Sequence, residues 1–225
     1  MDRLSISVSA GEVFGFIGPN GAGKTTVFNV ITGVYKTSGG DVRYENQSLL
    51  GKRPHEILSL GIARTFQTIR LFNNMTAVEN AMVAQHCRSK RGVIGAILRT
   101  RSQKHEEKRI RDRAREALIF MGVEQYADEV AQNLPYGLQR RLEIARALAS
   151  EPQIMLLDEP AAGMNPAESM ALMDDIARIS DLGINILLVE HDMKVVMAVS
   201  DHITVLDYGK KIAEGTPTEV RANPK

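Results

Sequence analysis

A glycine-rich segment near the start of the chain ends in a lysine and two threonines: Gly18-Pro19-Asn20-Gly21-Ala22-Gly23-Lys24-Thr25-Thr26. Glycines let a backbone approach an anion closely, and successive amide groups can then point into one concavity. A helix that begins near Lys24 would add the positive end of its dipole. The Lys24 ammonium can reach the β- and γ-phosphates of a nucleotide, and the Thr25 hydroxyl can ligate Mg²⁺. The pattern predicts a site for the phosphates of a nucleotide, together with Mg²⁺, rather than an ordinary glycine turn.

Two adjacent carboxylates follow an apolar run, 154–157, in the second half of the chain. A triphosphate site needs a carboxylate for the metal and a base for the attacking water, and open α/β sheets bind ligands at the carboxyl ends of their strands. We therefore expect Asp158 to hold the hydration shell of Mg²⁺ and Glu159 to orient or deprotonate the water. The alternative is a strand-end turn with two solvated acids.

One histidine stands in a comparable position. His191 follows the apolar run 184–189, one strand–helix–strand unit after Glu159. Neighbouring parallel strands end at the same edge of a sheet, so we expect His191 to lie beside Glu159 and to position the γ-phosphate or the water. A solvated histidine at a strand end is the alternative. The other histidines have no metal-ligand spacing with one another or with Cys87: His55, His86, His105 and His202.

Short apolar runs alternate with helical patterns, which indicates an α/β fold with a mostly parallel sheet. Runs that are apolar throughout suit strands buried on both faces, and alternating runs suit half-buried strands. The expected strands are 4–8, 13–17, 40–44, 154–157, 184–189, and a terminal hairpin of 203–207 and 210–214. The expected helices are 25–31, one from a capping box at 76–79, one through 110–121 that Gly122 ends, 138–150, one from Asn165 to Gly183, and one from Thr216.

Composition excludes several classes of protein. Of 225 residues, 44% are hydrophobic and 24% charged, so the chain is neither disordered nor fibrous. The length suits one large domain or one domain with an insertion. A single cysteine excludes a disulfide scaffold and fits a reducing compartment. No apolar run approaches the ~18 residues that span a bilayer.

Charge is uneven in one segment, 88–116, although the whole chain has a net charge of only +1. This segment holds eleven Lys or Arg and four Asp or Glu residues. Three interpretations remain: a solvated basic face, contact with anionic lipid or a polar membrane partner, and nucleic-acid binding. The absence of interleaved aromatic residues argues against the last.

In their order along the chain, these motifs resemble those of the ATP-binding cassette (ABC) ATPases. The resemblance rests on 18–25, Gln67, 134–139, Asp158-Glu159 and His191. Several stretches further resemble the ATP-binding subunit of branched-chain amino acid uptake transporters, and a relative that drives lipopolysaccharide export is less similar there. They are Arg64-Thr65-Phe66-Gln67 with Arg70-Leu71-Phe72, 136–146, 158–166 and Glu190-His191-Asp192-Met193-Lys194.

The resemblance implies an α/β fold with a P-loop NTPase core, a small antiparallel β lobe and an inserted α-helical lobe. The core and the β lobe would occupy 1–68 and 151–225, and the helical lobe 69–150. Two such subunits would face head to tail around two ATP molecules. Gly137 and Gln139 of the signature loop would then contact the nucleotide of the partner subunit. Gln67 would contact the metal and couple it to the helical lobe.

The resemblance also implies a function and partners. The chain would hydrolyse ATP to energise import of branched-chain amino acids, or related small amino acids or amides, at the cytoplasmic face of the bacterial inner membrane. Its partners would be a second ATPase subunit, identical or different, integral membrane permeases and, indirectly, a solute-binding protein, but no nucleic acid. The rivals are a soluble ABC-type ATP switch, the ATPase subunit of a lipopolysaccharide exporter, and a regulatory module without turnover, against which Glu159 argues.

The chain departs from the family's pattern in three places. Leu134-Pro135-Tyr136-Gly137-Leu138 stands where the family usually has Leu-Ser-Gly-Gly-Gln. Pro135 offers neither a hydroxyl nor an N–H to a phosphate, so we expect weaker nucleotide-driven pairing. Asn165 replaces the usual aspartate of the loop after Glu159. A further strand and an adenine-stacking aromatic residue would lie upstream of Met1.

Overall fold

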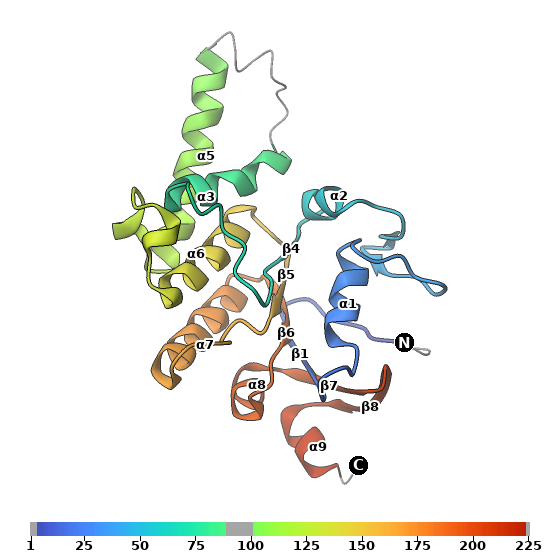
Figure 1. The fold of residues 1–225 in the computed structure, drawn as a ribbon. Helices are drawn as coiled ribbons and strands as arrows, with labels where there is room; N and C mark the ends of the chain where they lie inside the picture. Colours follow the sequence, from blue (N-terminus) through green and yellow to red (C-terminus); the bar gives the residue numbers. More distant parts are fainter. Residues whose placement is uncertain (1–3, 89–100, 224–225) are drawn as a thin grey trace. The chain divides into compact units, whose positions relative to one another are not determined.

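The computed structural model describes residues 4–88 and 101–223. It divides into two compact units, Met1–Gln67 with Gln153–Lys225, and Thr68–Pro152 (Figure 1). Residues 89–100, which form much of the basic segment 88–116, lie outside the described residues. In the described part of the chain, no helix combines the length and the apolar character needed to cross a membrane.

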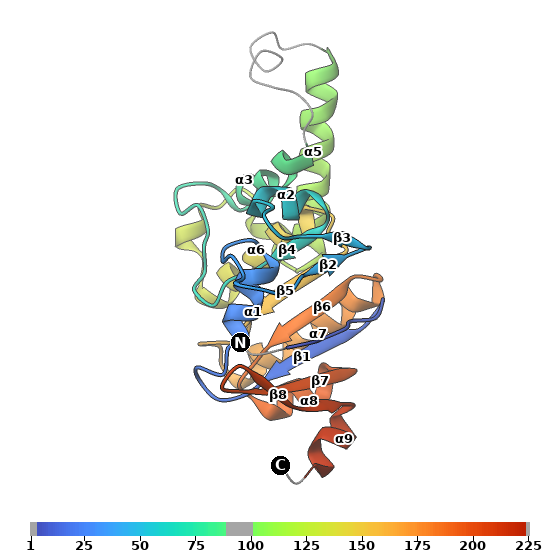
Figure 2. The ribbon, with the colours of Figure 1, turned by 90° about the vertical axis from the view of Figure 1, so that its right-hand side faces the viewer.

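The first unit is built on a six-stranded sheet in the order β4-β5-β6-β1-β7-β8. The first five strands pair in parallel, and only β8 is antiparallel to its neighbour β7. The mostly parallel sheet expected from the sequence is therefore confirmed (Figure 2). The strands are β1 (Val13–Ile17), β4 (Ile62–Arg64), β5 (Ile154–Asp158), β6 (Asn185–Val189), β7 (His202–Asp207) and β8 (Lys210–Gly215).

A second sheet contains two short antiparallel strands, β2 (Arg43–Tyr44) and β3 (Gln47–Ser48). The residues between them, Glu45 and Asn46, have φ angles of 47° and 63°. Positive φ at both central residues is what a two-residue type I′ hairpin requires. The small antiparallel sheet implied by the resemblance is thus present, but β2 is shorter than the expected strand 40–44.

The strand expected at 4–8 is wrong, although its pattern of burial is right. Leu4, Ile6 and Val8 are half-buried and pack against the core, while the serines between them are exposed. This segment forms no strand, and all six strands of the main sheet come from other parts of the chain. Alternation of apolar residues reports which side faces the core, not whether a partner strand is available.

The helices of the first unit begin where the sequence carries local start signals. The side chains of Asn165 and Thr216 each accept a hydrogen bond from the backbone N–H three residues later. In both capping boxes, the glutamate at that later position accepts a hydrogen bond from the backbone N–H of the cap residue. Two helices, α2 and α8, have no counterpart among those expected. The helices are α1 (Lys24–Ile31), α2 (Pro54–Ser59), α7 (Pro166–Asp181), α8 (Met193–Val199) and α9 (Pro217–Ala222).

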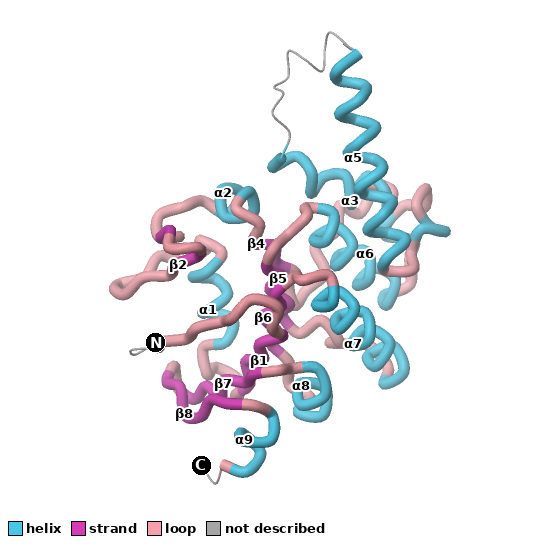
Figure 3. Tube along the Cα trace, turned by 180° about the vertical axis from the view of Figure 1, so that it is seen from behind, coloured by secondary structure: helices cyan, strands magenta, loops and turns pink. Residues whose placement is uncertain are grey.

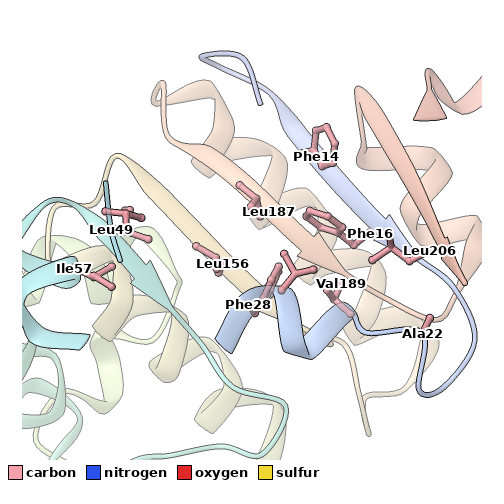
Figure 4. Packing of buried hydrophobic residues seen from close by; sticks show 12 residues of the cluster. Phe14, Phe16, Ala22, Phe28, Leu49, Ile57, Leu156, Leu187, Val189 and Leu206 are labelled. Carbon is pink, nitrogen blue, oxygen red and sulfur yellow. The ribbon is translucent and has the colours of Figure 1, made fainter. Parts of the chain in front are cut away.

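Both faces of the parallel sheet are covered, with α1 on one side and α7 and α8 on the other (Figures 1 and 3). On the α1 side, Phe16 of β1 and Leu187 of β6 pack in one cluster with Phe28 of α1 (Figure 4). On the other side, a Cβ at Gly15 would lie 2.8 Å from Val196 of α8, so the helix packs closely on β1. This packing fixes the carboxyl ends of the strands, where the candidate site residues lie.

The second unit is helical, with α3 (Ala77–Val83), α5 (Arg101–Phe120) and α6 (Tyr136–Ala149) packed on one another. The expected capping box at Thr76 opens α3, and Gly122, with a φ of 67°, follows α5. Helix α6 begins two residues earlier than expected, with Pro135 as its N-cap. Gly137 therefore lies in the first turn of α6 instead of before it. The described part of this unit also contains three short 3₁₀ turns: η1 (Ala84–Arg88), η2 (Glu124–Tyr126) and η3 (Ala131–Asn133).

Candidate functional site

The glycine-rich segment forms the connection between β1 and α1. Gly18 has a φ of 150°, and a Cβ there would lie 2.0 Å from the carbonyl oxygen of Leu206. Gly23, the residue before α1, has a φ of 105°. Gly18 is needed both because a side chain has no room there and because its φ is positive, and Gly23 is needed because its φ is positive. The loop is thereby held in a shape that exposes Asn20 and Gly21 ahead of the helix N-terminus.

Lys24 is the first residue of α1 and is only 6% exposed. Its Nζ donates hydrogen bonds to the carbonyl oxygens of Gly18 at 2.6 Å and Pro19 at 3.1 Å. Burial lowers the pKa of Lys24, and the nearby Glu159 and Asp158 carboxylates oppose that shift. The loop therefore closes around the buried ammonium group of Lys24. An anionic ligand in the loop would interact with this group. Thr25 is exposed next to it and Thr26 is half-buried.

Asp158, the last residue of β5, is held on one side by a residue whose role the sequence did not suggest. Its Oδ2 accepts a hydrogen bond from Nη2 of Arg64 at 2.9 Å, in an ion pair whose side chains are almost fully buried. The same guanidinium donates through Nη1 to Asn29 and Thr32 of α1 and its C-cap. Burial raises the pKa of Asp158, and Arg64 opposes the shift.

The other oxygen of Asp158 fits a metal site. Among the described residues, Asp158 Oδ1 is buried and has no hydrogen-bond partner. A buried acceptor without a partner costs free energy, which a water molecule of a metal's hydration shell would recover. Carboxylate and hydroxyl oxygens are the ligands that Mg²⁺ prefers, and usually with several retained waters. Asp158 and the exposed Thr25 hydroxyl therefore suit Mg²⁺. No group of three or more His, Cys, Asp or Glu side chains in the described part of the chain forms a metal cluster of its own.

We predict that Arg64→Met lowers the free energy of unfolding by about 3–5 kcal/mol, because it leaves the buried Asp158 carboxylate without its cation. Urea unfolding of the nucleotide-free protein measures the change. Arg64→Lys keeps the charge but loses the fork that bonds Asp158 and α1 together, so its loss should be smaller. Arg53→Met is the matched control, since it removes a mostly exposed ion pair with Glu56. It should cost less than about 1 kcal/mol. Equal losses in Arg64→Met and Arg53→Met would contradict the prediction.

Glu159 is held through both carboxylate oxygens. His191 Nε2 lies 2.5 Å from Oε1, and Gln67 Nε2 donates to Oε2 at 2.8 Å. The backbone of Glu159 has a φ of 48°, and its N–H donates to the carbonyl oxygen of Val189 at the end of β6. Strain of this kind in a non-glycine residue is maintained only where the surroundings fix it, and it is frequent at active sites. The neighbouring strand ends thus bring His191 to Glu159, as the spacing predicts.

Gln67, which the resemblance implies as a contact of the metal, lies beside Glu159 and donates to its Oε2. Gly137 and Gln139 belong to the second unit. The side chain of Gln139 donates to the carbonyl oxygen of Leu134, so it braces the turn that leads into α6. Pro135 and Tyr136 are exposed at the start of that helix.

Two residues of the site were missed as functional candidates, Arg64 and Glu190. Both stand at strand ends, Arg64 as the last residue of β4 and Glu190 directly after β6. A charged residue that closes an apolar strand next to an expected acidic site is the signal that could have found them. The partner of Arg64 could not be identified, because the pairing of β4 with β5 was not known from the sequence.

Comparisons with known proteins cover the whole chain. The family model for ABC transporters matches residues 1–162. The high-affinity branched-chain amino acid transport ATP-binding protein LivG of Escherichia coli (strain K12) is 45% identical over 225 residues, which are 100% of this chain and 88% of that protein.

Two solved structures are similar in fold as well. One is the ADP conformation of an ATP-binding cassette of an ABC transporter, with a TM-score of 0.83 and 33% identity over 98% of this chain and 88% of that one. The other is the dimeric structure of a post-hydrolysis state of a cassette bound to ADP and Pi. Its TM-score is 0.78, with 25% identity over 94% of this chain and 88% of that one.

Proposed function

The chain belongs to the ABC transporter family, and from this premise we propose that it is the ATP-hydrolysing subunit of an importer for branched-chain amino acids. The pore would be formed by separate permease chains, and the subunit would work at the cytoplasmic face of the bacterial inner membrane. Identity of 45% to LivG along the entire chain supports this choice among the members of the family.

The observation that carries the ATPase proposal is the arrangement around Glu159. Its carboxylate is fixed by His191 at 2.5 Å and by Gln67 at 2.8 Å, and it directly follows Asp158. A general base must be held in one orientation and must keep an oxygen able to accept a proton from water. Fixing both oxygens by single hydrogen bonds leaves each with a remaining lone pair for that purpose.

The roles of the other residues follow from their chemistry. The amides of 18–25 and the Lys24 ammonium would bind the phosphates, exchanging the bonds of Nζ to Gly18 and Pro19 for bonds to phosphate oxygens. Thr25, Gln67 and Asp158 would hold Mg²⁺, which offsets the charge on the phosphate oxygens when bound. His191 would orient Glu159 and so position the γ-phosphate or the attacking water.

We further propose that the second unit is the helical lobe and that two subunits, identical or different, pair around ATP. The dimeric cassette with bound ADP and Pi, similar to this chain over 94% of its length, supports pairing. Gly137 and Gln139 would serve the partner's nucleotide, since Gly137 lies in the first turn of α6, where free amides and the helix dipole favour an anion. Permease chains and, indirectly, a solute-binding protein would complete the transporter.

Replacing Pro135 by serine is expected to strengthen ATP-dependent pairing. A serine adds a hydroxyl and an N–H, and each charge-assisted bond to phosphate contributes roughly 1.5–3 kcal/mol. The dissociation constant of the ATP-bound dimer should therefore fall at least about tenfold. Analytical ultracentrifugation with ATP and Mg²⁺ measures it, in the Glu159→Gln background to prevent turnover.

Position 135 is also the N-cap of α6, so serine would stabilise the helix as well. Pro135→Asp separates the two effects. Aspartate caps a helix about as well as serine, but its negative charge repels a phosphate. It should raise the melting temperature as serine does without strengthening the dimer. Tighter pairing in both variants would attribute the gain to helix capping and would reject the missing phosphate contact.

Transport tests the proposed function directly. The subunit is reconstituted in proteoliposomes with its permease chains and the solute-binding protein. ATP is supplied on the side of the membrane where this subunit lies, and uptake of labelled leucine is measured. ATP-dependent uptake that isoleucine and valine inhibit is the expected result. Uptake inhibited only by urea, short amides or other amino acids would correct the substrate, and absence of ATP hydrolysis would reject the function.

A further inference from the structure

A second carboxylate lies beside the candidate base and has no part in the function proposed above. Glu190 directly follows β6 and is only 6% exposed. Burial raises the pKa of its carboxyl group. Glutamate is rarely buried unless its oxygens have partners that offset the loss of water. The identity of those partners indicates what Glu190 does.

The two oxygens of Glu190 accept hydrogen bonds from the backbones of two different segments. Oε1 accepts from the N–H of Ala161 at 2.9 Å, and Oε2 accepts from the N–H of His191 at 3.2 Å. Ala161 lies in the loop that follows Glu159, and His191 carries the imidazole that contacts Glu159. One buried carboxylate thus joins the backbones on either side of the candidate base.

This link runs in the same direction as the one already described, from the end of β6 toward the end of β5. His191, at the end of β6, reaches Glu159 at the end of β5 through its side chain, whereas Glu190 reaches past Glu159 to Ala161. The loop that follows Glu159 is tightly turned, since Ala162 N–H donates to the carbonyl oxygen of Glu159 and Met164 N–H donates to that of Ala161. A shift of the loop would therefore pull on Glu190 and, through it, on the backbone of His191.

We infer that Glu190 is a positioning residue that keeps His191 and the loop 160–165 in one frame. Its carboxylate fixes the position of the His191 backbone, from which the imidazole extends. It thereby keeps His191 Nε2 at hydrogen-bond distance from Glu159. The inference rests on the proposed ATPase function. Glu190 has no role in holding nucleotide, because its hydrogen bonds go to the backbones of Ala161 and His191. Its loss should slow hydrolysis and leave ATP affinity nearly unchanged.

The test uses Glu190→Ala and Glu190→Gln in the full chain with ATP and Mg²⁺. Misplaced catalytic groups cost up to about a hundredfold in rate, so kcat should fall about tenfold to a hundredfold in Glu190→Ala. The ATP affinity from calorimetry should change less than about threefold. Glutamine keeps the shape and one accepting oxygen but turns an NH₂ group toward the other N–H, so its kcat should lie between those of alanine and wild type.

A double-mutant cycle with His191→Ala distinguishes positioning from simple stabilisation. If Glu190 acts through His191, the double variant should be hardly slower than His191→Ala alone. Glu219→Gln is the matched control, since it weakens a carboxylate–amide bond of the same kind at the start of α9 and should leave kcat unchanged.

The outcomes separate the inference from the function on which it rests. A wild-type chain that does not hydrolyse ATP would overturn both. An active wild type with unchanged kcat in Glu190→Gln and Glu190→Ala, or with fully multiplicative losses in the cycle, would overturn the inference alone. If Glu190→Ala does not fold, Glu190→Gln and its own cycle with His191→Ala decide the question.

Discussion

Glu159→Gln is expected to lower the rate of ATP hydrolysis by about 10²–10⁴-fold, the usual contribution of a positioned general base. Glutamine has the same shape as glutamate, and its amide oxygen can still accept one of the two hydrogen bonds from His191 and Gln67. It can also occupy the backbone conformation of Glu159, with its φ of 48°, at about the same cost. The loss would therefore reflect the missing base and not a collapsed site.

Two measurements check this result. Phosphate release gives kcat, and calorimetry with ATP and Mg²⁺ gives affinity, which should stay within about threefold of wild type because Glu159 is absent from the phosphate loop. Glu168→Gln serves as the control, since Glu168 is an exposed acid of a capping box on α7. A Glu159→Gln variant with an unchanged rate would move the base elsewhere and would favour a nucleotide-binding module in which Glu159 has no catalytic part.

The meeting of His191 with Glu159 could be predicted, because it depends on one property of parallel sheets. Two consecutive buried runs with a helix between them form adjacent parallel strands in many α/β folds, and their carboxyl ends then coincide. The register of β5 with β6 pairs Asp158 with Val189, so Glu159 and His191 both lie just beyond the sheet. Sequence order alone carries this information.

Arg64 could not be predicted in the same way. It lies in β4, which pairs with β5 although α3, α5 and α6 separate the two strands in the chain. The pairing of Arg64 with Asp158 depends on that long connection, and no local pattern encodes it. When a long segment is inserted between two strands that pair, the pairing persists in the fold. The spacing of residues in the sequence then no longer indicates it.

Helix starts differ in how well local chemistry determines them. The sequence predicts the starts at Thr76, Asn165 and Thr216, and in the structure each has a capping box that satisfies its own amides within four residues. The expected start of α6 at residue 138 is too late, because the helix already includes Tyr136 and Gly137. Proline lacks an N–H, so Pro135 fits at a helix N-terminus without a capping side chain, and the following residues can already be helical.

Lys24→Met is expected to weaken ATP binding by about a hundredfold or more. Two charge-assisted bonds to phosphate contribute roughly 1.5–3 kcal/mol each, and 1.4 kcal/mol corresponds to a factor of ten. Methionine keeps the unbranched stem in its buried place but cannot bond the phosphates. Calorimetry measures the affinity, and thermal unfolding without nucleotide measures stability. Stability should change little, because removing a poorly solvated ammonium offsets the loss of its bonds to Gly18 and Pro19.

The pH dependence of binding gives the same prediction an internal control. Burial lowers the pKa of Lys24 below its ordinary value of 10.5. Phosphate prefers the ammonium form, so the ATP affinity of the wild-type protein should decline as the pH rises through the lowered pKa. Lys24→Met has no such group, and its weak affinity should not show this decline. If both proteins lose affinity in parallel at alkaline pH, the ammonium group of Lys24 is not what binds the phosphates, and the loop acts through its backbone amides alone.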